Sequence, residues 1–346
     1  NLVSIENFSD RRWTLDHRRD LFFLKKVFKY FSPDINFSWK KLIKAEKSFK
    51  FLRNIKNRIN KKNEFIEKVV IGSANFTQNY GLNSKKINLD EINKILTLAK
   101  KNKIKRIDTA ANYLNDDSIF KKKNFKFNII SKIQPTIKWV SFSYCKKELD
   151  IHLKRLNHKI DIILFHDLKI LYKKEGRLIF NNLNILKKKG YFNKIGISIY
   201  NPNCLSYLIS KYDIEVVQCP YNLFDKRIIN TGWFNKLKKR GIEIHARSIF
   251  LQGLLLNYEN IKKKYFNEWK QHFNLLHKYL RKNNISKIDY CINDLIQHNF
   301  DNIVVGIDSY KNLKQIINFK PLKYQNKLVD FTINDLRLTD PRKWKI

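Results

Sequence analysis

The sequence lacks the features that mark secreted or membrane-spanning chains. No apolar run reaches the roughly 18 residues that a membrane-spanning helix needs, and no signal-peptide pattern opens the chain. The four cysteines are scattered without CxxC spacing, which predicts reduced thiols in a cytoplasmic protein and not a disulfide framework. Methionine is absent and the chain begins at Asn1, so we expect a trimmed chain or a fragment of a longer reading frame.

Acidic residues are also scarce. The chain has 31 Asp and Glu against 70 Lys and Arg, a formal net charge of +39. Such a balance is compatible with binding to polyanions. The lysines are spread along the whole chain in KK and KKK groups, however, and no nucleic-acid-binding motif accompanies them. The pattern favours lysine-coated solvated faces over specific nucleic-acid binding, and non-specific binding of polyanions stays open as an alternative.

The first 66 residues differ from the remainder. Leu21, Leu24, Phe28 and Phe31 recur at helical spacing, and this pattern by itself indicates a helical appendage. The segment IENFSDRRWTLDHRRDLFFLKKVFKYF (5–31) also carries an R-x-T-x-D…D-L pattern. It resembles the end of a cytidylyltransferase domain of the spore-coat-polysaccharide and acylneuraminate type. The resemblance implies a C-terminal remnant of such a domain and a linker over residues 1–66, with no cytidylyl transfer by this chain.

From about residue 67 to the end, short β-rich runs alternate with amphipathic helical patterns. Eight runs with interleaved helices predict a parallel (β/α)₈ TIM barrel over residues 67–346. A doubly wound sheet is the alternative, but no GxGxxG follows the first run. The eight runs are 68–76, 104–109, 127–133, 160–167, 192–200, 214–222, 242–248 and 302–309.

Ionisable residues stand at the ends of three successive runs. Asp108 ends the second, Lys132 the third and His166 the fourth, and Tyr113 follows Asp108 in the next loop. The active site of such a barrel lies at the carboxyl ends of its strands, so these four side chains are expected to converge. Each alone is more often a cap, an ion pair or a packing residue. Their joint occurrence is informative, because burying ionisable groups is costly unless they are paired.

The four residues fit the reduction of a carbonyl. The developing alkoxide needs a proton, and a phenol, with its ordinary pKa near 10, is a poor acid. A neighbouring ammonium lowers that pKa. We therefore interpret Tyr113 as proton donor, Lys132 as its activator and Asp108 as the anchor of the lysine. His166 would orient the carbonyl oxygen by donating a hydrogen bond.

These motifs also carry a family resemblance over about 250 residues. VVIGSANFTQNYGL, RIDTAANY, NIISK, DIILFHD, IGISIYNP, VVQCPYN, IHARSIFLQGLLL and VVGIDS occur in the order found in aldo-keto reductases. The resemblance implies a barrel that binds NADPH, with NADH also possible, and a small-molecule carbonyl substrate. Asp108, Tyr113, Lys132 and His166 occupy the family's four catalytic positions.

The resemblance also implies cofactor-binding positions. Ser198 and Gln218 would hold the nicotinamide carboxamide, and Arg247 stands where many members stack an aromatic residue on the nicotinamide ring. Asn312 occupies the place of the Arg or Lys that often grips the 2′-phosphate. The remaining candidates follow strands seven and eight: Ser248, Gly253, Gly306, Ser309 and Gln315.

Three hypotheses of function follow from the sequence. The first is an NAD(P)H-dependent oxidoreductase acting on an aldehyde, ketone or sugar carbonyl. The cytidylyltransferase-like segment associates it with surface polysaccharide or nucleotide-sugar metabolism. The second is a cofactor-binding barrel with a regulatory role and no catalysis, and the third is a polyanion binder. The histidines have no ligand spacing with Cys or Asp, so no metal site is expected.

Overall fold

The computed structural model separates into two compact units, Asn1–Asn63 with Pro321–Asn326, and Glu64–Lys320 with Lys327–Ile346. In the first unit, residues 27–31 are helical, and the ring of Phe31 stacks on that of Phe37 at 4.1 Å. Most of the cytidylyltransferase-like segment, including Leu21 and Leu24, lies outside the described residues. The structure describes residues 25, 27–34, 36–38, 40–41, 61–77, 81–82, 87–113, 120, 127–156, 160–261, 263–322 and 328–346.

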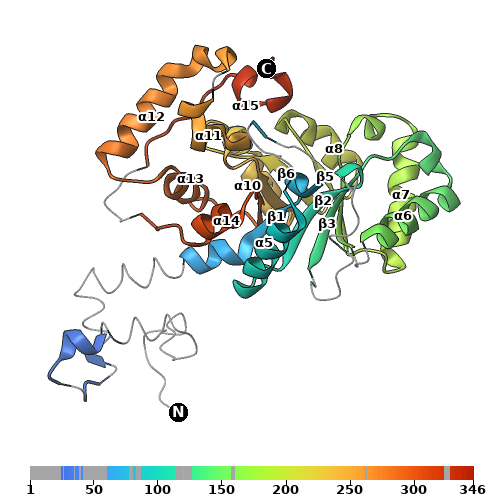
Figure 1. Ribbon diagram of the computed structural model, residues 1–346. Helices are drawn as coiled ribbons and strands as arrows, with labels where there is room; N and C mark the ends of the chain where they lie inside the picture. Colours follow the sequence, from blue (N-terminus) through green and yellow to red (C-terminus); the bar gives the residue numbers. More distant parts are fainter. Residues whose placement is uncertain are drawn as a thin grey trace. The chain divides into compact units, whose positions relative to one another are not determined.

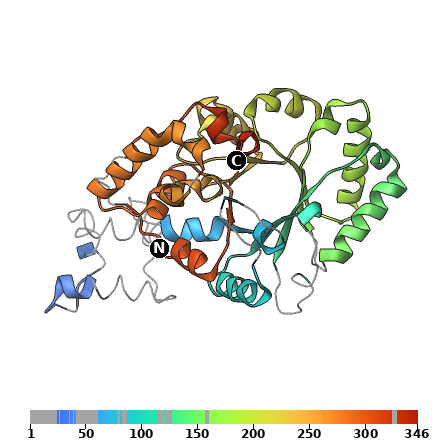
Figure 2. The same cartoon turned by 45° about the horizontal axis from the view of Figure 1, so that its top comes forward.

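The second unit is a closed barrel of eight parallel strands, in which each strand pairs with its neighbour in sequence and β8 pairs with β1 (Figures 1 and 2). This confirms the predicted TIM barrel and contradicts the doubly wound alternative, because a doubly wound sheet is open. The strands are β1 (Val69–Gly72), β2 (Arg106–Ala110), β3 (Asn128–Ile133), β4 (Ile160–Phe165), β5 (Lys194–Ser198), β6 (Val216–Pro220), β7 (Glu243–Arg247) and β8 (Asn302–Gly306).

Amphipathic helices surround the strands (Figure 2). In α5 the buried residues Ile92, Ile95, Leu96 and Ala99 form one helical face, and the Asn88 side chain caps the first turn by accepting from the Glu91 N–H. The other helices are α4 (Ala74–Thr77), α6 (Phe142–Leu156), α7 (Glu175–Lys188), α8 (Leu205–Lys211), α9 (Arg227–Asn230), α10 (Trp233–Lys239), α11 (Leu254–Asn257), α12 (Lys270–Lys282), α13 (Lys287–Leu295), α14 (Tyr310–Ile317) and α15 (Leu336–Thr339).

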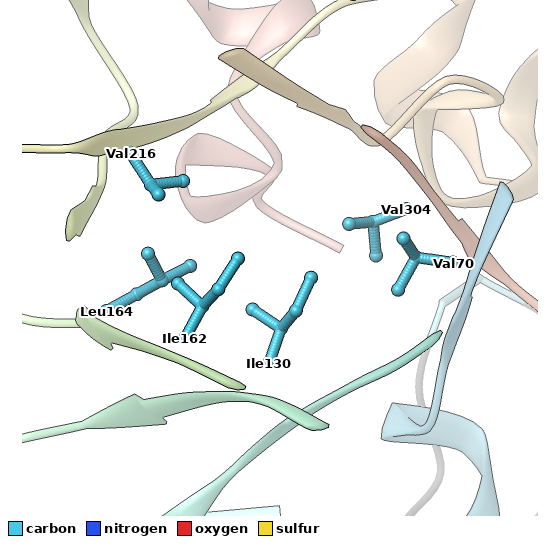
Figure 3. Packing of buried hydrophobic residues seen from close by; sticks show 6 residues of the cluster. All are labelled: Val70, Ile130, Ile162, Leu164, Val216 and Val304. Carbon is cyan, nitrogen blue, oxygen red and sulfur yellow. The ribbon is translucent and has the colours of Figure 1, made fainter. Parts of the chain in front are cut away.

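The barrel interior is layered. Its middle is an apolar cluster of Val70, Ile130, Ile162, Leu164, Val216 and Val304, whose side chains point toward one another (Figure 3). Fully burying each such side chain contributes about 1.5–3 kcal/mol. At the amino ends of the strands, polar side chains replace them: Asn302 accepts from Arg106 at 3.3 Å and contacts His245 at 2.9 Å. The apolar layer therefore separates this polar end from the carboxyl ends of the strands.

Within the described residues, no helix is both long and apolar enough to cross a membrane.

Candidate active site

Asp108 and Lys132 meet inside the barrel. Asp108 lies on β2 and Lys132 on the adjacent β3, and the Lys132 ammonium donates a hydrogen bond to Asp108 Oδ1. The same ammonium donates to the Thr109 carbonyl at 3.2 Å. The second oxygen, Asp108 Oδ2, accepts from Gln218 Nε2 of β6 at 2.9 Å. Both charged residues are about 4% exposed, so each offsets the cost of burying the other.

Tyr113 and His166 lie beside this pair. Tyr113 ends the 3₁₀ helix that follows β2, and the Lys132 ammonium is 5.7 Å from the centre of its ring. His166 follows directly after β4, and its backbone N–H donates to Ile133 of β3 at 2.8 Å. The rings of Tyr113 and His166 meet edge to face with centroids 6.2 Å apart. The structure thus brings all four residues of the predicted tetrad together.

Burial and charge set the protonation states here. Burial is the main cause that lowers the pKa of His166 to about 4, and the positive charges of Lys132 and Arg247 lower it further. His166 is therefore neutral near pH 7 and can donate a hydrogen bond. Burial also lowers the pKa of Lys132, the Asp108 carboxylate opposes that shift, and Arg247 adds to it.

A cavity of about 160 Å³ opens beside the tetrad. Asp108, Tyr113 and Lys132 line it, whereas His166 is not among the lining residues. The other lining residues come mainly from the segments after β1, β7 and β8. They include Gly72, Asn75, Gly81, Leu82, Gln218, Arg247, Ser248, Phe250, Gln252, Gly253, Asn257, Gly306, Asp308 and Asn312.

One family model, described as the aldo/keto reductase family, matches residues 68–329 of the chain. This chain belongs to the aldo-keto reductase family. Members of the family are NAD(P)-dependent oxidoreductases that act on carbonyl compounds, and this aldo-keto reductase is an enzyme of that general class. The family match does not extend to the cytidylyltransferase-like segment, which stays a prediction.

Solved structures share the fold. The holo form of the aldo-keto reductase AKR11C1 from Bacillus halodurans is 19% identical, with a TM-score of 0.58 over 74% of this chain and 88% of that one. The thermostable aldo-keto reductase Tm1743, solved with the inhibitor epalrestat, is 18% identical, with a TM-score of 0.54 over 72% and 88%. No curated protein sequence matches this chain.

The cofactor positions expected in this aldo-keto reductase divide into two groups. Gln218, Arg247, Ser248, Gly253, Gly306 and Asn312 line the cavity. Three others do not. Ser198 is buried on β5 opposite Gln218, the Ser309 hydroxyl caps α14 by accepting from the Asn312 N–H at 3.1 Å, and Gln315 is exposed on α14.

The lining of the cavity suits the polar groups of a dinucleotide. Several buried polar atoms on or beside it have no hydrogen-bond partner among the described residues: Asn75 Oδ1, Gln218 Oε1, Asn312 Oδ1 and His166 Nδ1. A Cβ atom added at Gly253 or Gly306 would meet nothing within 4 Å. Orphaned polar atoms and open space above glycines are what a site leaves for the polar groups of a ligand.

The loop after β7 is held in an unusual backbone conformation. Ser248, Leu251 and Gln252 have φ values of 59°, 48° and 52°, although none is glycine. Such left-handed residues are sparse and cluster at ligand sites. Sequence reasoning identified Ser248 and Gly253 in this loop but missed Gln252, and it also missed Asn75 and Asp308. The only signal for Asp308 was its place between Gly306 and Ser309 in VVGIDS.

Proposed function

We propose that this enzyme reduces an aldehyde, ketone or sugar carbonyl, with Tyr113 as the proton donor. The observation that carries the proposal is the contact of Lys132 with Asp108 on one side and with the Tyr113 ring on the other. When bound, the nicotinamide cofactor supplies the hydride. Lys132 favours the phenolate that remains after Tyr113 has given its proton to the carbonyl oxygen.

The other two residues act on the same oxygen and the same lysine. His166 is neutral near pH 7, so its role is to orient the carbonyl oxygen with an N–H group and not to release a proton. Asp108 fixes the ammonium of Lys132, and Gln218 holds the second carboxylate oxygen of Asp108 in place. The amide oxygen of Gln218, Oε1, has no hydrogen-bond partner among the described residues and is available to the carboxamide of a nicotinamide ring.

For the cofactor, NADPH is the expectation from the family, and the enzyme would also accept NADH. Gly306 at the end of β8 lines the cavity, as do Asp308 and Asn312 after it, so this part of the lining includes a carboxylate and no Lys or Arg. A carboxylate suits the hydroxyl groups of an unphosphorylated ribose, whereas a 2′-phosphate calls for a cation. Kd values for NADPH and NADH, measured by nicotinamide fluorescence, distinguish the two.

The proposal also includes a domain division and a biological setting. The division into an appendage of residues 1–66 and a barrel of residues 67–346 is part of this proposal. So is the association with polysaccharide or nucleotide-sugar metabolism, which rests on the cytidylyltransferase-like segment alone. The four cysteines are free thiols, which suits the reducing cytoplasm. A substrate panel should therefore contain sugar and nucleotide-sugar carbonyls beside simple aldehydes.

The test is the substitution Tyr113→Phe. It removes the proton donor and keeps the ring, so we expect turnover of any accepted carbonyl to fall by about 100-fold or more, while Kd for the cofactor is unchanged. Tyr172→Phe is the matched control, because Tyr172 is an exposed tyrosine that stacks on Tyr207. Full turnover by Tyr113→Phe would refute the role of the phenol. Cofactor binding without turnover across the whole panel would favour the regulatory hypothesis.

A further inference from the structure

Three side chains form a stack at the wall of the cavity. The guanidinium of Arg247, which lines the cavity, lies 4.2 Å from the centre of the Tyr200 ring. The guanidinium of Arg342 lies 3.5 Å from the centre of the same ring. Arg247 ends β7, Tyr200 follows β5, and Arg342 belongs to the 3₁₀ helix Pro341–Lys343 near the C-terminus. We call Arg247, Tyr200 and Arg342 the cationic stack.

The outer member of the cationic stack is firmly anchored. Asp340 is 4% exposed, and its carboxylate accepts from Arg342 Nε at 2.9 Å and from Arg342 Nη2 at 2.6 Å. The Trp344 indole donates to the Leu338 carbonyl at 2.8 Å, and its ring packs edge-on against buried Phe266. The C-terminal segment thus fixes Arg342 against Tyr200, and the charge of Arg342 is matched by Asp340.

The inner member is anchored differently. Arg247 Nη2 donates to the Ile199 carbonyl at 2.9 Å, and Nη1 donates to Ser248 Oγ at 3.2 Å. Within the described residues these partners are neutral oxygens, so Arg247 is held in place without a matching carboxylate. Its positive charge reaches the tetrad, because it lowers the pKa of both Lys132 and His166.

Among the described residues, the ammonium of Lys132 is matched by Asp108, whereas Arg247 has no carboxylate partner. Asp308 also lines the cavity, but the charge that lowers the pKa of both Lys132 and His166 is that of Arg247. A productive nicotinamide ring must lie next to Tyr113, since its hydride and the phenolic proton are delivered to the two ends of one carbonyl bond. Such a ring would lie in the cavity that both Tyr113 and Arg247 line. The oxidised ring is a cation and the reduced ring is neutral, so Arg247 repels only the oxidised form.

We infer that the cationic stack makes this site discriminate between the two redox forms of its cofactor, so that the oxidised dinucleotide binds more weakly than the reduced one. Arg247 supplies the charge, and Tyr200 and Arg342 are positioning residues that hold its guanidinium at the wall. The inference rests on the proposed function, because it needs a nicotinamide dinucleotide in this cavity. It favours release of the oxidised cofactor after carbonyl reduction, and release steps limit turnover in many enzymes.

The test is the ratio of Kd for the oxidised form to Kd for the reduced form, measured by titration of the full chain with NADP⁺ and NADPH and with NAD⁺ and NADH. For Arg247→Gln we expect the ratio to fall about tenfold, the effect of removing one partly screened unit charge. Arg342→Gln should lower it about threefold, since Arg247 keeps its charge but loses its support. Tyr200→Leu should act like Arg342→Gln, and Tyr200→Phe should preserve the ratio, because it keeps the ring.

Arg337→Gln is the matched control. Arg337 also belongs to the C-terminal segment and also lies over an aromatic ring, that of Trp269 at 5.4 Å, but it pairs with Asp335 and Glu268. Its substitution should leave the ratio unchanged. Thermal melts establish that each variant is folded, and Tyr200→Leu provides the same test should Arg342→Gln not fold.

The possible failures are separable. If the wild-type chain binds none of the four dinucleotides, the proposed function fails and this inference fails with it. If both redox forms bind and the ratio is the same in the wild type and in Arg247→Gln, the inference alone is overturned. A change in the ratio that Arg337→Gln reproduces would also overturn it, because the effect would then be one of general surface charge.

Discussion

His166 shows how a single residue acquires its chemistry from its surroundings. An exposed imidazole is half protonated near pH 6.5, but burial and the charges of Lys132 and Arg247 lower the pKa of His166 to about 4. The ring therefore stays neutral through the physiological range and keeps one N–H for hydrogen bonding. This supports the proposal that Tyr113 is the proton donor, because a neutral imidazole is a far weaker acid than an imidazolium.

The same shift predicts a dependence of stability on pH. The unfolded chain binds a proton at His166 below pH 6.5, whereas the folded chain resists it down to about pH 4. The stability that neutral His166 provides is complete above pH 6.5 and is lost as the pH falls toward 4. The slope is at most about 1.4 kcal/mol per pH unit, and partial exposure reduces it.

Urea denaturation of the wild type and of His166→Gln across this pH interval measures the effect. The variant should lose stability less steeply, since its side chain does not titrate. His272→Gln is the control, because His272 is exposed on α12. If the free energy of unfolding fell equally steeply with pH in the wild type and in His166→Gln, the folded protein would not resist protonation of His166.

At the scale of the elements, the periodic features were predictable from the sequence. The eight strands could be located because each lies in a short β-rich run, and these runs alternate with amphipathic helical patterns. The convergence of Asp108, Lys132 and His166 then follows from parallel strands whose carboxyl ends share one face. Side chains at loop positions could not be placed in this way, because loops have no period. Asp308 illustrates this: it follows β8, it lines the cavity, and it was not predicted.

The cationic stack was beyond sequence reasoning for a different reason. Tyr200 and Arg342 are far apart in the chain, and their contact depends on how the C-terminal segment packs on the barrel. Arg247 itself was singled out, because it stands where an aromatic residue is usual. Its partner Tyr200 could have been suspected only as an aromatic residue directly after a strand end.

Gly196 of β5 lies where the neighbouring strands leave no room for a side chain. A Cβ atom at this position would lie 2.2 Å from the Val216 carbonyl oxygen of β6 and 2.8 Å from Leu164 Cδ2 of β4. Backbone cannot move away as a flexible side chain can, so Gly196→Ala should lower the free energy of unfolding by about 3 kcal/mol. Urea denaturation checks this value.

Gly190 offers the comparison. It follows α7 with a φ of 81°, and nothing lies within 4 Å of an added Cβ. Asn tolerates this left-handed conformation, so Gly190→Asn should cost no more than about 1 kcal/mol. If Gly196→Ala and Gly190→Asn lowered the free energy of unfolding equally, β5 and β6 would be able to separate and admit a methyl group.

At the scale of the whole molecule, charge is the dominant property. With 70 Lys and Arg against 31 Asp and Glu, basic groups outnumber acidic groups more than twofold. Buried acids such as Asp108 and Asp340 form ion pairs within the fold. Like charges spread over a folded surface repel one another and oppose the compact state. Salt screens that repulsion over a Debye length of about 10 Å at 0.1 M, whereas buried pairs are screened much less.

Added salt should therefore stabilise this protein. We expect the free energy of unfolding to rise by about 1 kcal/mol between very low ionic strength and about 0.15 M sodium chloride, which raises Tm by about 2 °C for a chain of this size. Thermal melts at fixed pH measure it, with a neutral solute of equal osmolality as the control. The expectation assumes that repulsion among the excess basic groups outweighs the attraction of the surface ion pairs, such as Arg337 with Glu268. A Tm that falls with salt would mean that the surface ion pairs outweigh the net charge.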